Sequence, residues 1–321
     1  MARAPLLALA ALLAHGPLSG CARPAAEAAP GSPRSAERFV VFESNRTGDF
    51  RIWLAPLDGA QPPALRRLSP DDPGRDHCCA AISPDGARVV YLALPRHRRR
   101  YLPRRTPGEL RLIELESGRS RVLSTSANHD GESRAAIWWS PTELVYLESD
   151  DTTRKLDLAA GTNETIVPAS EGGGWLVAPG GRAATGSKPT FSVREPSGAI
   201  RLATDLGGCQ PTFTFDGELG LWSAGAGGPL DLVDLETRET RSIVRRGDVR
   251  LPQGRRYLYF PAISADRTLF GWAASNDTHD HFHADYDVYV AEVDPESLAL
   301  TGAPLAVAPH PAVDRYPALF S

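Results

Sequence analysis

The sequence contains almost no lysine and carries no excess of positive charge. Lys155 and Lys188 are the only lysines among 321 residues, and the formal net charge is −4. Nucleic-acid-binding domains carry a basic patch or stripe, so this charge balance argues against nucleic acid as a partner. The chain also lacks a Gly-x-Ser-x-Gly nucleophile elbow and a phosphate-binding Walker loop. No nucleophile or nucleotide motif therefore indicates an enzyme class.

No hydrophobic run near the N-terminus is long enough to cross a bilayer. Pro5–Leu13 is apolar but well short of the roughly 20 residues that a spanning helix needs; it fits the core of a signal peptide instead. It leads into Leu18-Ser19-Gly20-Cys21, which resembles a bacterial lipobox. We therefore predict a lipoprotein signal peptide over residues 1–20 and a lipidated, Ala/Pro-rich tether over 21–37. The alternative is an ordinary signal peptide with an incidental cysteine.

A lipid on Cys21 would attach the chain to a membrane of the cell envelope. Ala22 after the lipidated cysteine resembles outer-membrane sorting, so we expect an anchor in the outer membrane with the protein facing the periplasm. This compartment permits disulfides, and Cys78, Cys79 and Cys209 remain after Cys21. Adjacent cysteines rarely bond to each other without strain. A disulfide bond from Cys78 or Cys79 to Cys209 is possible, and the sequence does not decide it.

One segment type recurs along the chain: a short apolar strand, a Pro/Asp/Gly turn and a second apolar strand. The clearest copy is Ala80–Leu92, AAISPDGARVVYL, and related copies occur at 137–147, 211–222 and 261–272, with a weaker one at 175–181. Each copy is a β-hairpin signal, and further strands follow it. Units of four short strands at this spacing are typical of β-propeller blades.

The strands at the two ends of the chain can be combined into one complete repeat unit. The last copy, residues 316–320, has no room for further strands, whereas residues 39–46, 50–57 and 65–68 are strand-like and lack a first strand. We therefore predict an all-β fold over residues 38–321, a six-bladed β-propeller of four-stranded antiparallel blades. The C-terminal strand is expected to join the N-terminal blade and to close the ring without open sheet edges.

Two stretches resemble a known repeat. VFESNRTGDFRIWLAPLDG and AAISPDGARVVYLAL are similar to the PD40, or WD40-like, repeats of TolB-type propellers. The resemblance covers residues 38–321 and is weaker at Ser140–Thr142 and Ala178–Gly180. The small α/β domain of TolB is absent, so the resemblance does not imply TolB's role with Pal or colicins. The repeat also resembles that of oligogalacturonate lyases, which are propeller enzymes with a histidine-ligated metal.

A propeller has two rims, and different loops of the blades form each of them. With strands lettered a to d in chain order within a blade, the a–b and c–d turns form one rim, which we name the hairpin rim. The b–c loops and d–a links form the other. Asp85 and Gly86 lie on the hairpin rim and are expected to be structural turn residues.

The histidines beyond the signal segment all map to the second rim, which we name the histidine rim. Charged residues accompany them. We expect ligand contacts from six residues on this rim: His77, His129, Arg256, His310, Asp314 and Arg315.

The stretch Thr278–Asp287, THDHFHADYD, holds three of the eight histidines. If it is extended, His279, His281 and His283 point to one side, because side chains alternate along an extended chain. Imidazoles in that arrangement could bind a divalent metal. A structural polar loop and direct ligand contact are the alternatives. The arginine-rich residues 95–105 also allow two interpretations. They form either a solvated loop or a positively charged edge that attracts an anionic ligand.

These observations favour a non-enzymatic envelope lipoprotein that binds a protein partner or an envelope polymer at the histidine rim. The membrane is a second partner through the lipid anchor, and no cofactor is firmly implied. A divalent metal on the histidine trio would instead indicate a metal-dependent propeller enzyme such as a polysaccharide lyase. In that enzyme, Arg256 or Arg315 would neutralise a substrate carboxylate. A purely structural role in an assembly is the third reading.

Overall fold

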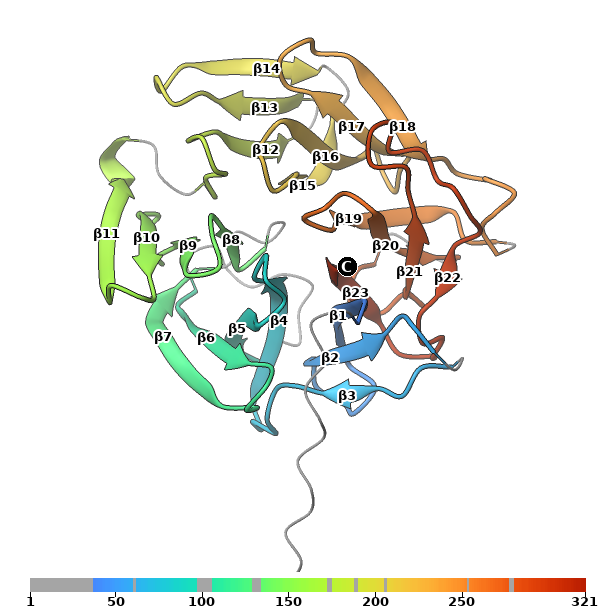
Figure 1. The fold of residues 1–321 in the computed structure, drawn as a ribbon, viewed down its shortest axis with the longest axis horizontal. Helices are drawn as coiled ribbons and strands as arrows, with labels where there is room; N and C mark the ends of the chain where they lie inside the picture. Colours follow the sequence, from blue (N-terminus) through green and yellow to red (C-terminus); the bar gives the residue numbers. More distant parts are fainter. Residues whose placement is uncertain are drawn as a thin grey trace, which may run out of the picture. The chain divides into compact units, whose positions relative to one another are not determined.

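The computed structural model describes residues 37–59, 62–96, 106–128, 134–171, 175–187, 190–204, 207–252, 254–276 and 280–321. They form an all-β propeller whose six antiparallel sheets, numbered 1 to 6 in chain order, are arranged in a ring (Figure 1). We use the word channel for the middle of this ring, where the innermost strands lie. Five sheets are blades of four strands and sheet 4 has three strands. The signal peptide and the tether lie outside these residues, apart from Glu37. In the described part of the chain, no helix has the length and hydrophobicity to span a membrane.

The strands of the first three blades follow. Blade 1 contains β23 (Asp314–Phe320), β1 (Phe39–Ser44), β2 (Arg51–Pro56) and β3 (Arg66–Arg67). Blade 2 contains β4 (Arg75–Ile82), β5 (Arg88–Pro95), β6 (Gly108–Glu114) and β7 (Ser120–Ala127). Blade 3 contains β8 (Ala136–Trp138), β9 (Glu143–Leu147), β10 (Thr153–Asp157) and β11 (Thr162–Val167).

The remaining strands complete the ring. A short 3₁₀ helix, Ala169–Glu171, precedes sheet 4, which contains β12 (Ala183–Ser187), β13 (Thr190–Arg194) and β14 (Ile200–Thr204). Blade 5 contains β15 (Gly208–Phe213), β16 (Leu219–Ala224), β17 (Leu230–Asp234) and β18 (Thr240–Val244). Blade 6 contains β19 (Tyr257–Ile263), β20 (Leu269–Ser275), β21 (Asp287–Glu292) and β22 (Leu305–Ala306).

The C-terminal strand closes the ring, as predicted. β23 pairs antiparallel with β1, with Phe39 opposite Phe320 and Ser44 opposite Asp314. The rings of Phe39 and Phe320 stack with their centroids 5.1 Å apart. The first blade therefore combines strands from both ends of the chain.

The prediction of six four-stranded blades is wrong, since the described residues form five such blades and a sheet 4 of three strands. Trp175–Ala178, expected to supply the missing strand, are bound by side chains of blade 3 instead. Trp139 Nε1 donates to the carbonyl of Val177 at 2.8 Å, and Thr153 Oγ1 donates to that of Trp175 at 3.0 Å. Among the described residues of this segment, only Val177 forms a β-bridge, and no strand is present there.

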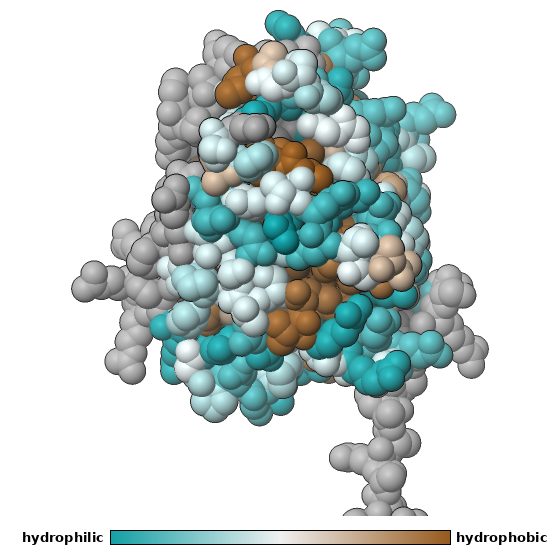
Figure 2. Space-filling model, turned by 90° about the vertical axis from the view of Figure 1, so that its left-hand side faces the viewer, coloured by the Kyte–Doolittle hydropathy of each residue, from teal (hydrophilic) through white to brown (hydrophobic). Residues whose placement is uncertain are grey.

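Burial is complete in the second strands of blades 1, 5 and 6 and lower at the outer edge of the ring. Every residue of β1, β16 and β20 is buried, whereas β7 and β11 are largely exposed. Inner strands are covered on both faces by neighbouring blades and therefore consist of nearly continuous apolar runs. On the side drawn in Figure 2, hydrophilic residues cover most of the surface and hydrophobic residues form separate patches.

The Ser-Pro-Asp-Gly segments are structural turns, as expected. Ser83 Oγ donates to Asp85 Oδ1 at 2.5 Å, and the amide of Gly86 donates to the carbonyl of Ser83 at 2.9 Å. Gly86 has a φ of 67°, a left-handed conformation that glycine adopts without steric cost. A Cβ at this position would lie 2.6 Å from the ring of Phe320. This turn therefore packs directly against the strand that closes the ring.

Bulges interrupt the innermost strands of four blades. Cys79, Gln210, Phe260 and Tyr316 have φ between 52° and 62°. Pairing with strand b stops before each bulge and resumes beyond it, as from Cys78 to Ala81. A bulge leaves backbone groups outside the ladder, and side chains bind them here. The amide of Cys79 donates to Glu43 Oε2 at 2.9 Å, and that of Phe260 donates to Gln210 Oε1 at 2.7 Å.

Candidate binding pocket in the central channel

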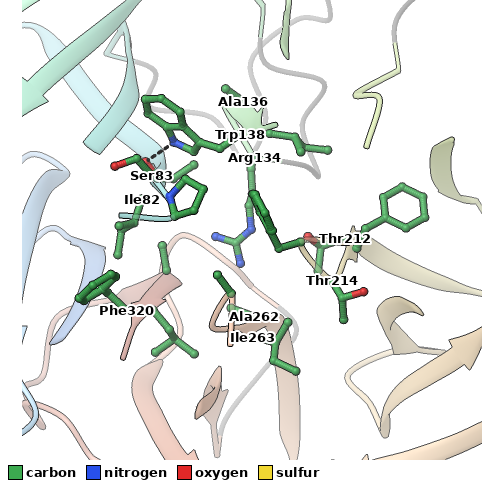
Figure 3. A pocket seen from close by; sticks show the side chains of 18 residues that line it. Ile82, Ser83, Arg134, Ala136, Trp138, Thr212, Thr214, Ala262, Ile263 and Phe320 are labelled. Carbon is green, nitrogen blue, oxygen red and sulfur yellow. Dashed lines mark hydrogen bonds between the residues drawn. The ribbon is translucent and has the colours of Figure 1, made fainter. Parts of the chain in front are cut away.

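A pocket of about 110 Å³ lies where the innermost strands of the five blades end (Figure 3). Its wall consists of Ala81–Pro84 from blade 2, Ala136–Trp138 from blade 3, Thr212–Phe215 from blade 5, Ala262, Ile263 and Ala265 from blade 6, and Ala318–Phe320 from blade 1. Four of these segments run into a–b turns, and the fifth is the C-terminal end of β23, which packs against the turn at Gly86. The pocket therefore belongs to the hairpin rim, on the opposite side from the expected ligand contacts.

Arg134 supplies the only charged side chain of the pocket lining. It lies in the link between β7 and β8, and its guanidinium points into the middle of the pocket (Figure 3). It donates to the carbonyl of Ala80 in blade 2 at 3.4 Å and to that of Pro261 in blade 6 at 3.2 Å. One side chain thus connects three blades.

The bulges explain why two carbonyls are available to Arg134. Ala80 follows the bulge residue Cys79, and Pro261 follows Phe260. Both lie in the gaps between paired residues, Cys78 to Ala81 and Tyr259 to Ala262. Their oxygens are therefore free of the ladder and can accept from a side chain. The wall beside them is fixed by Trp138, whose Nε1 donates to the carbonyl of Ala81 at 3.2 Å.

The electrostatics of Arg134 are unusual. Removal from water lowers the pKa of its guanidinium to about 10, because burial disfavours the charged form. Among the described residues no carboxylate forms an ion pair with it, and carbonyl oxygens are its only acceptors. A guanidinium has five N–H donors arranged to bind a carboxylate or a phosphate through two bonds. The pocket can therefore accept an anionic group.

A buried ion pair occupies the channel on the other side of the bulges. Arg315 Nε donates to Glu43 Oε1 over a short distance, and Arg315 Nη1 donates to the carbonyl of His281 at 2.6 Å. The guanidinium lies between the rings of Phe50 and Phe282, 4.3 and 4.4 Å from their centroids. Burial raises the pKa of Glu43, and the charge of Arg315 opposes this rise. Arg315, expected as a ligand contact, is placed here as part of the channel wall.

His281 and His283 lie in different environments, and His279 lies outside the described residues. The His281 side chain is buried, with its ring centroid 4.4 Å from that of Tyr259. His283 is 67% exposed, and its Nδ1 lies 3.1 Å from Asp280 Oδ2. The loop is not extended at this point, because the amide of Ala284 donates to the carbonyl of Asp280 at 2.9 Å. The alternation required for a shared metal is therefore absent from this pair.

His77 lies inside blade 2 rather than in a link. It belongs to β4, is fully buried and packs against Tyr91 with ring centroids 5.1 Å apart. Burial lowers the pKa of His77 to about 4, and the charge of Arg51 acts in the same direction, although Asp72, with Oδ2 3.6 Å from Nε2, partly opposes the shift. The imidazole is therefore neutral at pH 7.

The remaining expected contacts are dispersed. His310 is exposed, and its Nδ1 accepts from the amide of Ala312 at 3.0 Å. Asp314 is buried and paired with Arg46 at 2.6 Å; burial raises its pKa to about 7, although the charge of Arg46 opposes the rise. Arg256 is exposed over the ring of Tyr257.

The neighbouring Arg255 is 16% exposed; it binds Asp287 and lies 3.1 Å from Asp285. His129 and Cys21 lie outside the described residues, so their expected roles stay predictions.

Sequence reasoning missed Arg134 because a single arginine in a link has no signature. A signal for its surroundings does exist in the repeats Gln210-Pro211, Phe260-Pro261 and Tyr316-Pro317. In each pair the residue before proline is the left-handed bulge residue. Recognising these pairs as bulges would have indicated where backbone acceptors are exposed to the channel.

Comparisons with known proteins support the fold only. No protein-family model matches the sequence, and no curated protein does. Among solved structures, a chain of the nidogen/laminin complex aligns over 88% of this chain and 98% of its own length, with 10% identity and a TM-score of 0.54.

Two more distant structures correspond to the families that the repeats resemble. A putative TolB from Agrobacterium tumefaciens aligns over 87% of this chain and 98% of its own, with 13% identity and a TM-score of 0.47. An oligogalacturonate lyase in complex with manganese aligns over 81% and 87%, with 12% identity and a TM-score of 0.41. Neither likeness carries an argument about activity.

Proposed function

We propose that this chain is a non-enzymatic, TolB-like lipoprotein of the bacterial cell envelope, anchored through Cys21 to the outer membrane. Its propeller, in which sheet 4 counts as a shortened sixth blade, binds an acidic group of a partner protein in the pocket at Arg134. The lipobox-like residues 18–21 support the anchor. The contacts of Arg134 support the binding role.

The observation that carries the binding role is a desolvated guanidinium without a carboxylate partner in the described part of the chain. Burying an unpaired charge is costly, and a folded chain retains such a group where the charge has a use. Here the guanidinium faces a pocket rather than packed side chains, with Arg134 bonded to carbonyl oxygens at 3.2 and 3.4 Å. An incoming carboxylate would restore the missing counter-charge.

The size of the pocket favours a protein partner over a polymer. About 110 Å³ accommodates a group the size of one side chain, not a run of sugar units. The wall presents apolar side chains such as Ile263 and Phe320 around the single charge. An aspartate or glutamate side chain, or a C-terminal carboxylate, fits this combination of a small apolar wall and one cation.

A matched pair of probes tests the binding role. N-acetylglutamate carries the carboxylate and N-acetylglutamine is its neutral counterpart. We expect only the first to raise the melting temperature of the full chain, because a ligand that binds the folded state stabilises it. Arg134→Gln should weaken this binding by about 30-fold or more, since a buried charge pair is lost. Arg256→Gln is the control, because Arg256 is exposed.

Equal stabilisation by the two probes, or an unchanged response of Arg134→Gln, would contradict the binding role. The anchor has its own test. Metabolic labelling with palmitate should disappear in Cys21→Ala and persist in Cys209→Ala. Labelling that persists in Cys21→Ala would reject the anchor without affecting the pocket.

A further inference from the structure

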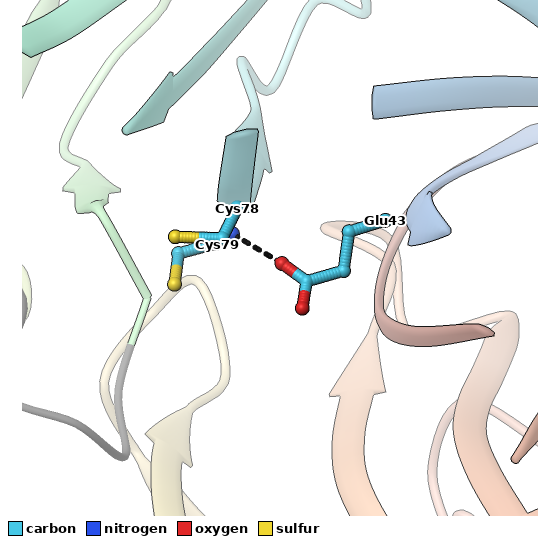
Figure 4. A group of neighbouring side chains, drawn as sticks. All are labelled: Glu43, Cys78 and Cys79. Atoms are coloured by element: carbon cyan, nitrogen blue, oxygen red, sulfur yellow. Dashed lines mark hydrogen bonds between the residues drawn. The ribbon is translucent and has the colours of Figure 1, made fainter. Parts of the chain in front are cut away.

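Three potential metal ligands meet in the channel wall. Glu43, Cys78 and Cys79 each offer one donor atom, these atoms lie within 4.8 Å of one another, and all three residues are buried (Figure 4). Within the described residues, this is the only group of three or more His, Cys, Asp or Glu side chains with that proximity. The group adjoins the backbone that binds Arg134, because Ala80 follows Cys79. None of its three side chains lines the Arg134 pocket, so they have no part in the proposed binding role.

The bulge in β4 brings the two sulfurs together. Successive side chains of a regular strand point to opposite faces, so adjacent cysteines would normally be separated by the sheet. Cys79 has a φ of 62°, and both sulfurs consequently lie on the same side of the backbone (Figure 4). Gln210, Phe260 and Tyr316 have the same left-handed conformation in other blades; at Cys79 it places two thiols together.

Glu43 is held in place as the third donor. The amide of Cys79 donates to its Oε2 at 2.9 Å, and Arg315 donates to its Oε1. Each carboxylate oxygen has a second lone pair, so these bonds orient the group without exhausting its acceptor capacity. Hydrogen bonds of this kind around a ligand are typical of metal sites.

The donor set determines the class of cation. Two thiols and a carboxylate suit a thiophilic ion such as Zn²⁺ or Cd²⁺, whereas Mg²⁺, Ca²⁺ and Mn²⁺ prefer oxygen ligands. Binding would replace two S–H bonds by two S–metal bonds and release two protons to solvent. Two thiolates and Glu43 would contribute three negative charges. A divalent cation and the guanidinium of Arg315 would contribute three positive charges, so the buried site would be neutral.

We propose that Glu43, Cys78 and Cys79 form a binding site for a thiophilic divalent cation such as Zn²⁺. The cation is bound by two thiolates and one carboxylate oxygen. This site differs in position and in ligand type from the histidine trio. The cation displaces one proton from each thiol, so its affinity rises with pH.

Cadmium titration of the full chain, kept reduced with a phosphine, is the test. We expect an ultraviolet thiolate-to-metal charge-transfer band that saturates at one equivalent, with release of two protons per ion. Cys79→Ser should lose this band and Cys78→Ser should lose it as well. Cys209→Ser is the matched control and should retain it, because Cys209 is also a buried cysteine but lies outside the group.

Several outcomes would overturn the site: no saturable band in the wild type, an unchanged band in Cys79→Ser, or equal loss in Cys209→Ser. Thermal unfolding of the metal-free variants separates loss of ligand from loss of fold, and a Cys79→Ser chain that unfolds like Cys209→Ser but lacks the band supports the site. Arg134→Gln should keep the band. The metal site and the carboxylate pocket can therefore fail independently.

Discussion

Two arginines in the channel illustrate two ways of burying the same charge. Toward the histidine rim, Arg315 binds Glu43 and lies between two phenyl rings. Toward the hairpin rim, Arg134 has two carbonyl oxygens as acceptors and faces a pocket. A buried charge with a full set of partners supports the fold, whereas a buried charge without a counter-ion provides a place for a ligand. The difference lies in the partners, since the side chains are identical.

The largest loss of stability is expected from removing Arg315, the buried arginine that has a carboxylate partner. Arg315→Ala leaves Glu43 buried without its cation and removes the contacts with Phe50 and Phe282. Breaking a buried pair in this way costs about 3–5 kcal/mol of unfolding free energy. Urea unfolding followed by tryptophan fluorescence measures the loss. Arg256→Ala should change stability by less than about 0.5 kcal/mol, as exposed substitutions usually do. A loss below about 1 kcal/mol in Arg315→Ala would contradict a structural role for this pair.

The pH dependence of stability tests the burial of His77, which is one of the six residues expected to contact a ligand. Its pKa falls from 6.5 to about 4 on folding, so the unfolded chain takes up a proton between these values and the folded chain does not. Stability from His77 is therefore complete above pH 6.5 and is lost as the pH falls toward 4. The full loss is about 3 kcal/mol.

The variant His77→Phe isolates this contribution, because phenylalanine does not titrate while carboxylates elsewhere titrate in both proteins. Unfolding free energies at pH 7 and pH 4.5 should differ more in the wild type than in His77→Phe. Parallel pH profiles would mean that His77 has an ordinary pKa and is accessible to water, as a ligand-binding histidine would be.

A smaller effect is expected where a turn meets the closing strand. In Gly86→Ala the new methyl group meets Phe320 at 2.6 Å, whereas at Gly118 no atom lies within 4 Å. Both glycines have a φ close to 66°, so both substitutions carry a similar backbone cost of about 1–2 kcal/mol. The clash should add about 1 kcal/mol in Gly86→Ala. Equal losses of melting temperature in the two variants would show that the turn does not support ring closure.

The fold was predictable because it depends on repeated local patterns. Hairpin turns with Ser, Asp and Gly recur with the same hydrogen bonds, as at Ser83–Gly86 and Thr214–Gly217, and the unpaired strands at the two ends of the chain required each other. Sheet 4 was the exception. Where its fourth strand was expected, the carbonyls of Val177 and Trp175 accept bonds from Trp139 and Thr153 of blade 3. Contacts between such distant segments leave no local trace in the sequence.

The site was less predictable, because the position of a residue on a rim does not determine whether its side chain is buried or exposed. His281 and His283 are two residues apart, yet one is buried in the channel and the other is exposed. Arg134 carries no motif, and its importance depends on carbonyls that bulges in two other segments release. Adjacent Cys78 and Cys79 were visible in the sequence. Their convergence, however, depends on a left-handed residue that a regular strand would not contain.

Arg134→Met provides the sharpest contrast with Arg315, although its effect on stability is the smallest. Replacing a buried, unpaired charge by an apolar side chain of similar length is often neutral or stabilising. We therefore expect the unfolding free energy to rise by about 1 kcal/mol. The same variant should no longer distinguish N-acetylglutamate from N-acetylglutamine, so that stability and binding change in opposite directions. A fall in stability comparable to that of Arg315→Ala would mean that Arg134 is a structural bridge between blades 2, 3 and 6, and that its charge is not held for a ligand.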